Sequence, residues 1–188
     1  MINAMPDKPR PSEPRVPLIT EPDEELLEIL QGALTHDGTP LNIFGMLGHH
    51  PKLLKRFNLL GGFLLNKGLV PAREREIVIL RIGWRAQAVY EFGQHTIIGK
   101  NEGLTDAEIA GLAGADHAWS TRDAALIALA DDLADDDCVS DETWAAVSAD
   151  WMPDQVIELI VTAGFYRLVS GFLNSTGVPL DDGVPGWP

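Results

Sequence analysis

Apolar residues recur every three or four positions along most of this chain, as they do in helices that bury one face. No segment combines sustained apolar–polar alternation with β-branched residues and turn dipeptides, so we predict no strands. The predicted helices span residues 23–34, 43–50, 51–67, 71–85, 88–102, 105–112, 121–134, 141–151 and 153–174. The pattern therefore indicates an all-α fold.

Prolines and polar capping residues mark where these helices begin. Pro51, Pro71 and Pro153 stand at helix starts, where the missing N–H of proline costs nothing because it has no partner in a first turn. Side chains able to accept a hydrogen bond from a first turn are expected to cap four other helices: Asn42, Thr105 in a capping box with Glu108, Ser120 or Thr121, and Ser140.

A weak internal repeat links two of the predicted helices. Sliding the chain along itself by 82 residues aligns Pro71 with Pro153. The other matches at this shift are Glu76 with Glu158, Ile77-Val78-Ile79 with Leu159-Ile160-Val161, and Trp84-Arg85 with Tyr166-Arg167. Because the matches share one shift, we expect two similar helical units packed pseudo-symmetrically.

Composition divides the chain into an arm, one domain and a tail. Residues 1–20 form the arm, because five prolines among the first 17 residues oppose both helix and sheet. Residues 21–178 form a single all-α domain that is long enough to bury a core. Residues 179–188 form a C-terminal tail.

The net charge of −14 is unevenly spread along the chain. Residues 1–100 carry 12 basic and 11 acidic groups, whereas residues 101–188 carry 2 basic and 17 acidic groups. Such a chain repels phosphate backbones, so we expect no nucleic-acid partner. The aspartate run over residues 131–137 lacks the spacing, central glycine and closing glutamate of a calcium loop. We therefore interpret it as a solvated helix end and expect no metal.

Hydropathy and cysteine content indicate a soluble, cytoplasmic protein. Apolar residues make up 45% of the chain, and no apolar run approaches the roughly 20 residues that span a bilayer. Residues 1–16 lack the apolar segment of a secretory signal. The single Cys138 cannot form an internal disulfide, which fits a reducing compartment. We expect no membrane partner.

Glu76 is the first candidate for chemistry. On a helix it shares a face with Ile79, Leu80 and Gly83, so we expect it to be more than roughly 80% buried. A carboxylate on the core side must be hydrogen-bonded or neutralised. Such a group can hold or donate a proton, or it can tie helices together. The aligned Glu158 favours the second role, and the two roles are compatible.

Glu91 and His95 form the second candidate, since a spacing of four residues puts both side chains on one helical face. The carboxylate can then orient the imidazole and raise its pKa. The 82-residue shift places Leu173 and Gly177 at these positions, so the pair exists in only one unit. An isolated pair of this kind is more often a surface pair. Because the pair is missing from the second unit and the buried Glu76 is expected nearby, a catalytic group of Glu76, Glu91 and His95 is an equal alternative.

Three further side chains are candidates for substrate binding. Tyr90 and Trp84 are expected mainly in the core, where one of them can line a pocket, and Arg85 could bind a substrate carboxylate unless it pairs on the helix surface. His49 and His50 point about 100° apart on a helix, so we interpret them as helix-end residues. No phosphate loop, nucleophile elbow or zinc spacing is present, so we expect no cofactor.

Several stretches together resemble the carboxymuconolactone decarboxylase family. They are NIFGMLGHHP (42–51), GLVPAREREIVILRIGWR (68–85), YEFGQH (90–95) and GLTDAEIAGL (103–112). The ending LNSTGVPLDDGVPGWP is similar to that of longer family members, and the resemblance covers roughly residues 38–180. It implies a fold of helical hairpins shared with the alkylhydroperoxidase D (AhpD) proteins. It also implies a homotrimer or homohexamer with its pocket near subunit contacts.

The AhpD branch of this family combines a glutamate, a CxxC pair and a histidine. Aligning that histidine with His95 places the glutamate on Glu76 and the two cysteines on Ala88 and Glu91. A dithiol cannot cycle without its sulfurs, so the peroxidase activity of that branch should not carry over. The decarboxylase branch lacks the CxxC pair and has a glutamate four residues before its histidine, which matches Glu91 and His95.

The resemblance implies cofactor-free acid–base chemistry of the lyase or decarboxylase type on a small carboxylated or lactone intermediate of aromatic catabolism. His95, oriented by Glu91, would donate a proton while Glu76 holds a second one. One alternative is a non-catalytic binding or assembly protein of the same fold, and a less favoured one is an AhpD-like peroxidase. We also expect the N-terminal arm to reach over a neighbouring subunit.

Overall fold

A computed structural model shows a helical molecule. It describes residues 9–31, 33, 35–36 and 39–188. Residues 1–8 of the predicted arm, and residues 32 and 34 of the first predicted helix, lie outside the described residues. The helices of the described residues are α1 (Glu24–Leu30), α2 (Asn42–Leu47), α3 (Pro51–Asn66), α4 (Ala72–Arg85), α5 (Val89–Asn101), α6 (Asp106–Leu112), α7 (Thr121–Asp136), α8 (Asp141–Asp150) and α9 (Pro153–Thr176). The predicted all-α fold is confirmed.

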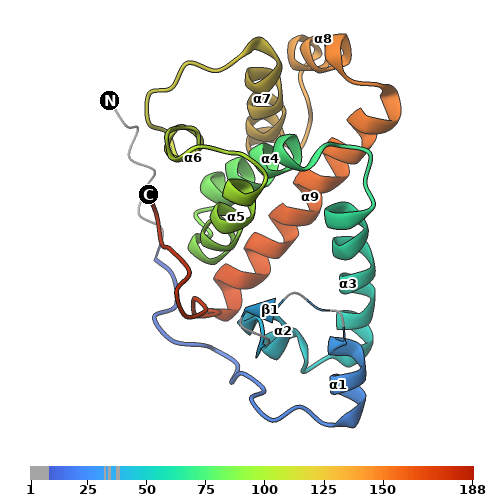
Figure 1. Ribbon diagram of the computed structural model, residues 1–188, viewed down its shortest axis with the longest axis vertical. Coiled ribbons are helices and arrows are strands. Elements are labelled where there is room, and N and C mark those ends of the chain that lie inside the picture. Colours follow the sequence, from blue (N-terminus) through green and yellow to red (C-terminus); the bar gives the residue numbers. More distant parts are fainter. Residues whose placement is uncertain (1–8, 32, 34, 37–38) are drawn as a thin grey trace.

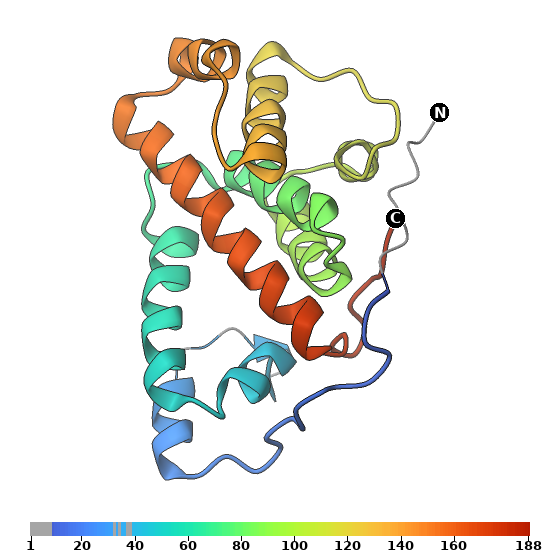
Figure 2. The same cartoon turned by 180° about the vertical axis from the view of Figure 1, so that it is seen from behind.

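Helix α9 is the central element. It runs diagonally through the molecule, with α4, α5 and α7 on one side and α3 on the other (Figure 1). The reverse view shows the same order, with α1 and α2 at one end of the molecule and α7 and α8 at the other (Figure 2). Helix α4 contacts α5, α7 and α9, so these four helices enclose the core.

Helix α4 supplies much of that core. Its residues Ile77, Val78, Ile79, Leu80 and Ile82 have no exposed surface. A helix that is covered on several sides can be apolar around most of its circumference. Burying each of these side chains stabilises the fold by about 1.5–3 kcal/mol relative to leaving it exposed.

Helix α9 is apolar enough, by length and composition alone, to cross a membrane. The expectation that no apolar stretch approaches this length was therefore too strict. Half of its most apolar window is buried inside the molecule, where Leu159 and Ala163 have no exposed surface. The core helix of a folded domain passes the same test of length and composition. Its contacts with α3, α4, α5, α7 and α8 account for its apolar composition.

Several predicted helix starts are confirmed. Thr105 and Glu108 form the capping box of α6, and the Ser140 side chain accepts a hydrogen bond from the first turn of α8. Of the two residues that could cap α7, Ser120 is the cap and Thr121 is the first helical residue.

Several boundary predictions are wrong, among them the end of the second predicted helix, since α2 ends at Leu47, three residues earlier than predicted. Helix α1 ends at Leu30, four residues earlier than predicted. Asn42 is the first residue of α2 and does not cap it; its amide donates hydrogen bonds to the carbonyls of Pro179 (3.2 Å) and Leu180 (3.3 Å). The Asn42 side chain therefore binds the C-terminal tail and not the first turn of α2. The local sequence around Asn42 could not predict this contact, because the tail is distant along the chain.

The absence of strands is also an incorrect prediction, although only marginally. Strands β1 (Thr35–His36) and β2 (Thr39–Pro40) form an antiparallel ladder of two residues each. A ladder of this length leaves no period-two pattern that sequence reasoning could detect.

The turn between α4 and α5 folds the two helices into a hairpin. Gln87 adopts a φ of 50°, and the Ala88 N–H donates a hydrogen bond to the Gly83 carbonyl at 2.9 Å. A Cβ atom at Gly83 would lie 3.4 Å from the amide nitrogen of Phe92 and 3.5 Å from the Glu91 side chain. The glycine thus lets α5 approach α4 closely, so that the predicted site residues of both helices meet.

The internal repeat corresponds to α4 and the first part of α9, which pack against each other. Helix α4 ends at Arg85, whereas α9 continues past the aligned position. Glu158 accepts hydrogen bonds from the backbone N–H groups of Leu69 (2.8 Å) and Val70 (2.9 Å), in the loop before α4. The aligned Glu76 has side-chain partners instead, so the two glutamates have different roles.

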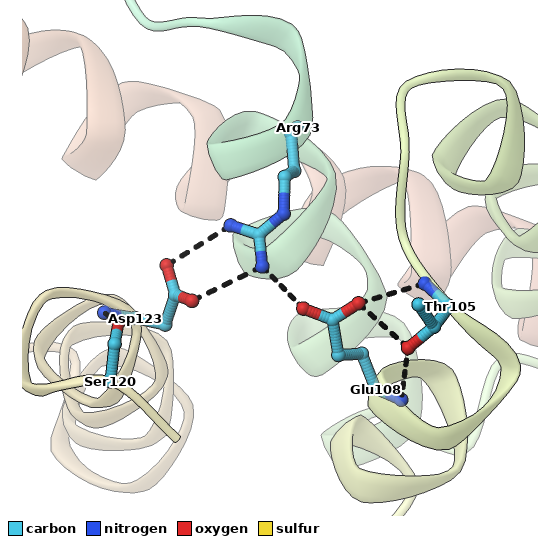
Figure 3. A network of polar contacts seen from close by, with 5 residues as sticks. All are labelled: Arg73, Thr105, Glu108, Ser120 and Asp123. Atoms are coloured by element: carbon cyan, nitrogen blue, oxygen red, sulfur yellow. Dashed lines mark hydrogen bonds and ion pairs between the residues drawn. The ribbon is translucent and has the colours of Figure 1, made fainter.

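A cluster of charged residues fastens α4 to α6 and α7 (Figure 3). Both terminal nitrogens of Arg73 donate to the Asp123 carboxylate, at 3.2 and 3.1 Å, and one of them also contacts Glu108. Glu108 belongs to the capping box with Thr105, and the Asp123 N–H donates to the cap Ser120 at 3.1 Å. One guanidinium therefore joins the starts of two helices.

The described part of the N-terminal arm lies against its own chain. The Arg15 N–H donates to the Thr176 carbonyl at the end of α9 (2.8 Å), and the Ile19 N–H donates to the Gly45 carbonyl of α2 (3.1 Å). These residues therefore cover α9 and α2 of their own subunit. Whether the arm also reaches a neighbouring subunit stays a prediction.

The C-terminal tail packs on the α4–α5 hairpin. The Trp187 ring lies 5.2 Å from the rings of both Trp84 and Phe92, measured between centroids. Gly93 of α5 leaves space for the tail, since a Cβ atom there would lie 2.2 Å from the Pro185 carbonyl oxygen. The segment predicted as a separate tail is thus a packed part of the domain.

Candidate functional site

Glu76 has no exposed surface, which confirms its predicted burial. Its Oε1 accepts a hydrogen bond from Arg75 Nε (3.1 Å), and its Oε2 lies 2.6 Å from His95 Nδ1. Arg75 is also buried and donates from Nη1 to the Leu65 carbonyl of α3 at 2.9 Å. A cation on each side offsets the cost of burying this carboxylate.

His95 lies between two carboxylates. Its Nδ1 faces Glu76, and its Nε2 lies 3.1 Å from Glu91 Oε1, one helical turn away on α5. Burial disfavours the charged imidazole, but the charge and hydrogen bond of Glu76, joined by those of Glu91, outweigh it and raise the pKa of His95 to about 10. At neutral pH the ring is therefore an imidazolium that donates from both nitrogens.

The four side chains form a chain of alternating charge. Arg75, Glu76, His95 and Glu91 follow one another, and each is less than a tenth exposed. Every charge has an opposite charge beside it, so the chain as a whole is neutral. Such an arrangement can hold a proton in the interior and move it along the row without leaving a buried charge alone.

A cavity of about 130 Å³ lies between α3, α5 and α9, at the Glu91 end of this row. Its walls are mostly apolar, with contributions from Phe57 and Phe165. Its polar lining comes from Asn58, Asn66, Tyr90, Glu91, Gln94, His95 and Tyr166. An apolar cavity of about 150 Å³ in another protein holds one benzene molecule, so this cavity has the size of a single ring.

Tyr90 lines the cavity, as predicted for one of the aromatic candidates. Its hydroxyl donates to Asp181 of the C-terminal tail and accepts from the Ile43 N–H at 3.3 Å. Burial and the Asp181 carboxylate both raise the pKa of Tyr90. Asp181 also accepts from Gln94 Nε2 (2.7 Å) and from the Asn42 N–H (2.8 Å). One tail carboxylate thus orients two cavity side chains.

Tyr166 is a cavity residue that sequence reasoning missed as a site residue. Its ring meets that of His95 edge to face, with 4.8 Å between centroids. Burial, together with the negative charges of Glu91 and Glu76, raises its pKa well above the ordinary value. The repeat aligned Tyr166 with Trp84 of α4. This alignment was the only feature of the sequence that drew attention to Tyr166, and it indicated a role in packing.

Trp84 and Arg85 are not among the residues that line this cavity. Trp84 packs against Phe92 and Trp187. Arg85 pairs with Asp131 (3.2 Å) and Asp135 of α7. Both side chains therefore have partners within the chain, and their role in substrate binding stays a prediction.

The aspartate run of α7 serves the helices around it. Asp131 receives a two-point hydrogen bond from Arg81 (2.7 and 2.8 Å), and Asp132 accepts from the Ser140 N–H that precedes α8 (2.9 Å). Among the residues that the structure describes, no three His, Cys, Asp or Glu side chains gather in a way that could hold a metal ion.

Comparison with protein-family models gives a match. Residues 51–132 match the model of the Carboxymuconolactone decarboxylase family, which confirms the resemblance seen in the sequence. A search of curated proteins found no match.

Solved structures with an AhpD-like fold are similar over nearly the whole chain. An alkylhydroperoxidase AhpD core protein from Ralstonia eutropha JMP134, described as an uncharacterized peroxidase-related protein, has 18% identity and a TM-score of 0.76, covering 90% of this chain and 93% of its own. An uncharacterized peroxidase-related protein from Silicibacter sp. TM1040 has 12% identity and a TM-score of 0.76, covering 92% and 96%. The debrominase Bmp8, in complex with 2,3,4-tribromopyrrole, has 14% identity and a TM-score of 0.70, covering 90% and 95%. At these identities the likeness shows the fold.

The positions aligned with the two cysteines of the AhpD motif hold no sulfur. Ala88 is fully buried before α5, and Glu91 is the carboxylate beside His95. Cys138 is exposed in the loop between α7 and α8. A carboxylate therefore stands beside the histidine where the motif has a thiol.

Proposed function

We propose, taking the match of residues 51–132 to the Carboxymuconolactone decarboxylase family as the premise, that this protein is an acid–base enzyme without a cofactor. Its reaction is of the lyase or decarboxylase type, and its substrate is a small carboxylated or lactone ring. The observation that supports this proposal is the Glu91–His95 pair on the wall of a ring-sized cavity, with Glu76 behind it.

The proton between Glu91 Oε1 and His95 Nε2 is the one that the enzyme delivers. His95 holds it at neutral pH because two carboxylates stabilise the imidazolium. When the proton passes to the substrate, Glu76 still receives the hydrogen bond from Nδ1 and keeps the ring in place. Water then restores the proton through the mouth of the cavity. Positioned proton transfer of this kind contributes roughly 10²–10⁴ to a rate.

In a decarboxylation, the bond between the ring carbon and the carboxylate breaks and CO2 leaves. The electron pair stays on the ring as an enolate or dienolate, and the delivered proton ends on carbon. On a lactone, the same pair can take a proton from one carbon and return it to another. The apolar walls at Phe57 and Phe165 exclude water from either intermediate.

The ring size of the cavity agrees with one of the similar structures. Bmp8 is a debrominase that was crystallised with a single-ring ligand, 2,3,4-tribromopyrrole. Thiol peroxidase chemistry is not part of the proposal, because Ala88 and Glu91 occupy the cysteine positions and Cys138 has no partner thiol in this chain.

The test is one variant measured in two ways. His95→Gln is compared with wild type for turnover of a panel of lactones, with and without a carboxylate, and for thermal unfolding. Loss of turnover by at least about 100-fold in a folded protein supports the enzyme. Lower stability with no turnover by wild type on any panel member favours the alternative of a non-catalytic binding protein, in which the buried row is structural. Glu102→Gln, an exposed carboxylate at the end of α5, is the matched control.

A further inference from the structure

The charged groups around the cavity leave no cation for an anionic ligand. No lysine or arginine is among the described residues that line it. Among the described lining residues, His95 as an imidazolium is the one positive charge, and both of its nitrogens already face carboxylates, at 2.6 and 3.1 Å. The group beside it is the Glu91 carboxylate. An anion in this space would lose its hydration without gaining a free counter-charge.

The hydrogen-bonding groups that remain suit a neutral molecule. Glu91 uses Oε1 for His95, and its Oε2 has no hydrogen bond to a described residue. Gln94 donates its amide to Asp181, which leaves its carbonyl oxygen as an acceptor. The Tyr166 hydroxyl donates to no other described residue, and its raised pKa keeps it protonated. Near Glu91 the wall thus offers two acceptors and a hydroxyl donor, and the amides of Asn58 and Asn66 add further uncharged donors and acceptors.

We infer that the ligand of this cavity is an uncharged single ring that carries a carbonyl oxygen for Tyr166 and a polarised hydrogen for Glu91. This inference rests on the proposed function, since it concerns the same site, and it narrows the substrate class from carboxylated or lactone rings to uncharged lactones and related cyclic carbonyl compounds. For such a ligand, the route described above for a lactone applies, in which the Glu91–His95 pair takes a proton from one carbon of the ring and returns it to another.

Two isosteric ring compounds test the inference. Benzamide and benzoate share shape and size and differ in charge, and each is titrated against the full chain near pH 7 by saturation-transfer NMR. We expect benzamide to bind at least about 10-fold more tightly, because benzoate places a second carboxylate beside Glu91. Tyr166→Phe should weaken benzamide by about 3- to 10-fold through the loss of one hydrogen bond. Gly62→Leu, at a lining position with open space around it, should abolish binding of both compounds.

Charge removal identifies the source of the selectivity. Glu91→Gln should bring the affinity for benzoate close to that for benzamide, whereas the control Glu102→Gln should leave the difference unchanged. If circular dichroism shows that Glu91→Gln does not fold, the inference is judged from the affinities of the wild-type chain for benzamide and benzoate. Equal or tighter binding of benzoate by wild type overturns the inference and leaves the proposed function standing. Binding of neither compound at millimolar concentration overturns the inference and removes the ring-sized site on which the proposed function depends.

Discussion

At the scale of single residues, His95 determines the charge of the interior. A lone buried imidazole is usually neutral, because burial disfavours its charged form. Here Glu76 and Glu91 hold it as a cation, and Arg75 balances Glu76 from the other side. The stability of the fold and the supply of a proton to the cavity therefore depend on the same group.

This dependence predicts how stability changes with pH. The folded pKa of His95, about 10, lies above the unfolded value of about 6.5. Its contribution is therefore complete below pH 6.5 and is lost as the pH rises toward 10, at up to about 1.4 kcal/mol per pH unit. We expect His95→Gln to cost about 3 kcal/mol near neutrality, because two carboxylates lose the cation between them. Urea unfolding of wild type and of His95→Gln between pH 6.5 and pH 10 checks the prediction. The difference between their free energies of unfolding should shrink toward pH 10. A difference in free energy of unfolding that stays constant across this pH range would contradict the prediction.

The residues of the site differ in how far sequence predicts them. Glu76, Glu91 and His95 follow from helical spacing, because a face of a helix is fixed by residues three and four apart. Their meeting required only the turn between two successive helices. Tyr166 and Asp181 reach the site from far along the chain, through the packing of α9 and of the tail, and no local pattern carries that information. The catalytic role of the constellation itself stays a prediction.

At the scale of elements, caps and prolines predicted helix starts well because they act within one turn. They failed at Asn42, where the tail, distant in sequence, takes the side chain. The repeat correctly paired α4 with the start of α9, and the helix predicted over residues 153–174 already extended beyond the aligned part. Gln87, in the left-handed region, turns the chain after α4. The aligned part of α9 has no such turn.

The cluster at Arg73 yields a prediction for the small helix α6. This helix has seven residues, too few to be stable alone, so its position depends on Glu108 and on the guanidinium that joins it to Asp123. We expect Arg73→Gln to lower the free energy of unfolding by about 2 kcal/mol and to speed amide hydrogen exchange in α6. Arg56→Gln, an exposed arginine on α3, is the control and should change stability by less than about 0.5 kcal/mol. A similar loss of free energy of unfolding in both variants would show that the Arg73 cluster stabilises the fold no more than an exposed arginine does.

The C-terminal tail yields a second prediction at this scale. Asp181 raises the pKa of Tyr90, in addition to the effect of burial. Since the chain has two tyrosines, Tyr90 and Tyr166, their ionisation can be followed by ultraviolet absorbance. Asp181→Asn should let one tyrosine ionise at a lower pH than in wild type, and the exposed neighbour variant Asp182→Asn should not. An unchanged titration in Asp181→Asn would mean that the tail does not orient Tyr90.

At the scale of the whole molecule, one face of α9 has no partner within the described chain. Ile157, Val161 and Leu168 lie on this face at helical spacing and are 62%, 42% and 60% exposed. Gly164, on the same face, has open space around it, so another helix could approach closely. Helix α3 adds exposed Leu59 and Phe63. Exposed apolar surface of this kind marks interaction sites, and sequence periodicity alone could not distinguish it from core.

We therefore predict that the chain self-associates through this apolar face of α9, as a homotrimer or homohexamer. Copies of the same chain packed around a symmetry axis are suitable partners, because the apolar side chains of α9 and α3 would then be covered in every subunit of a closed assembly. Light scattering at micromolar concentration should give a multiple of the 20.5 kDa chain mass. Leu168→Glu should reduce that mass toward the monomer, because each interface would then bury an unpaired charge. Trp144→Glu, at an exposed apolar position on α8, should leave the mass unchanged. A wild-type monomer would show that this face stays uncovered in solution, and an unaltered assembly in Leu168→Glu would place the interface elsewhere.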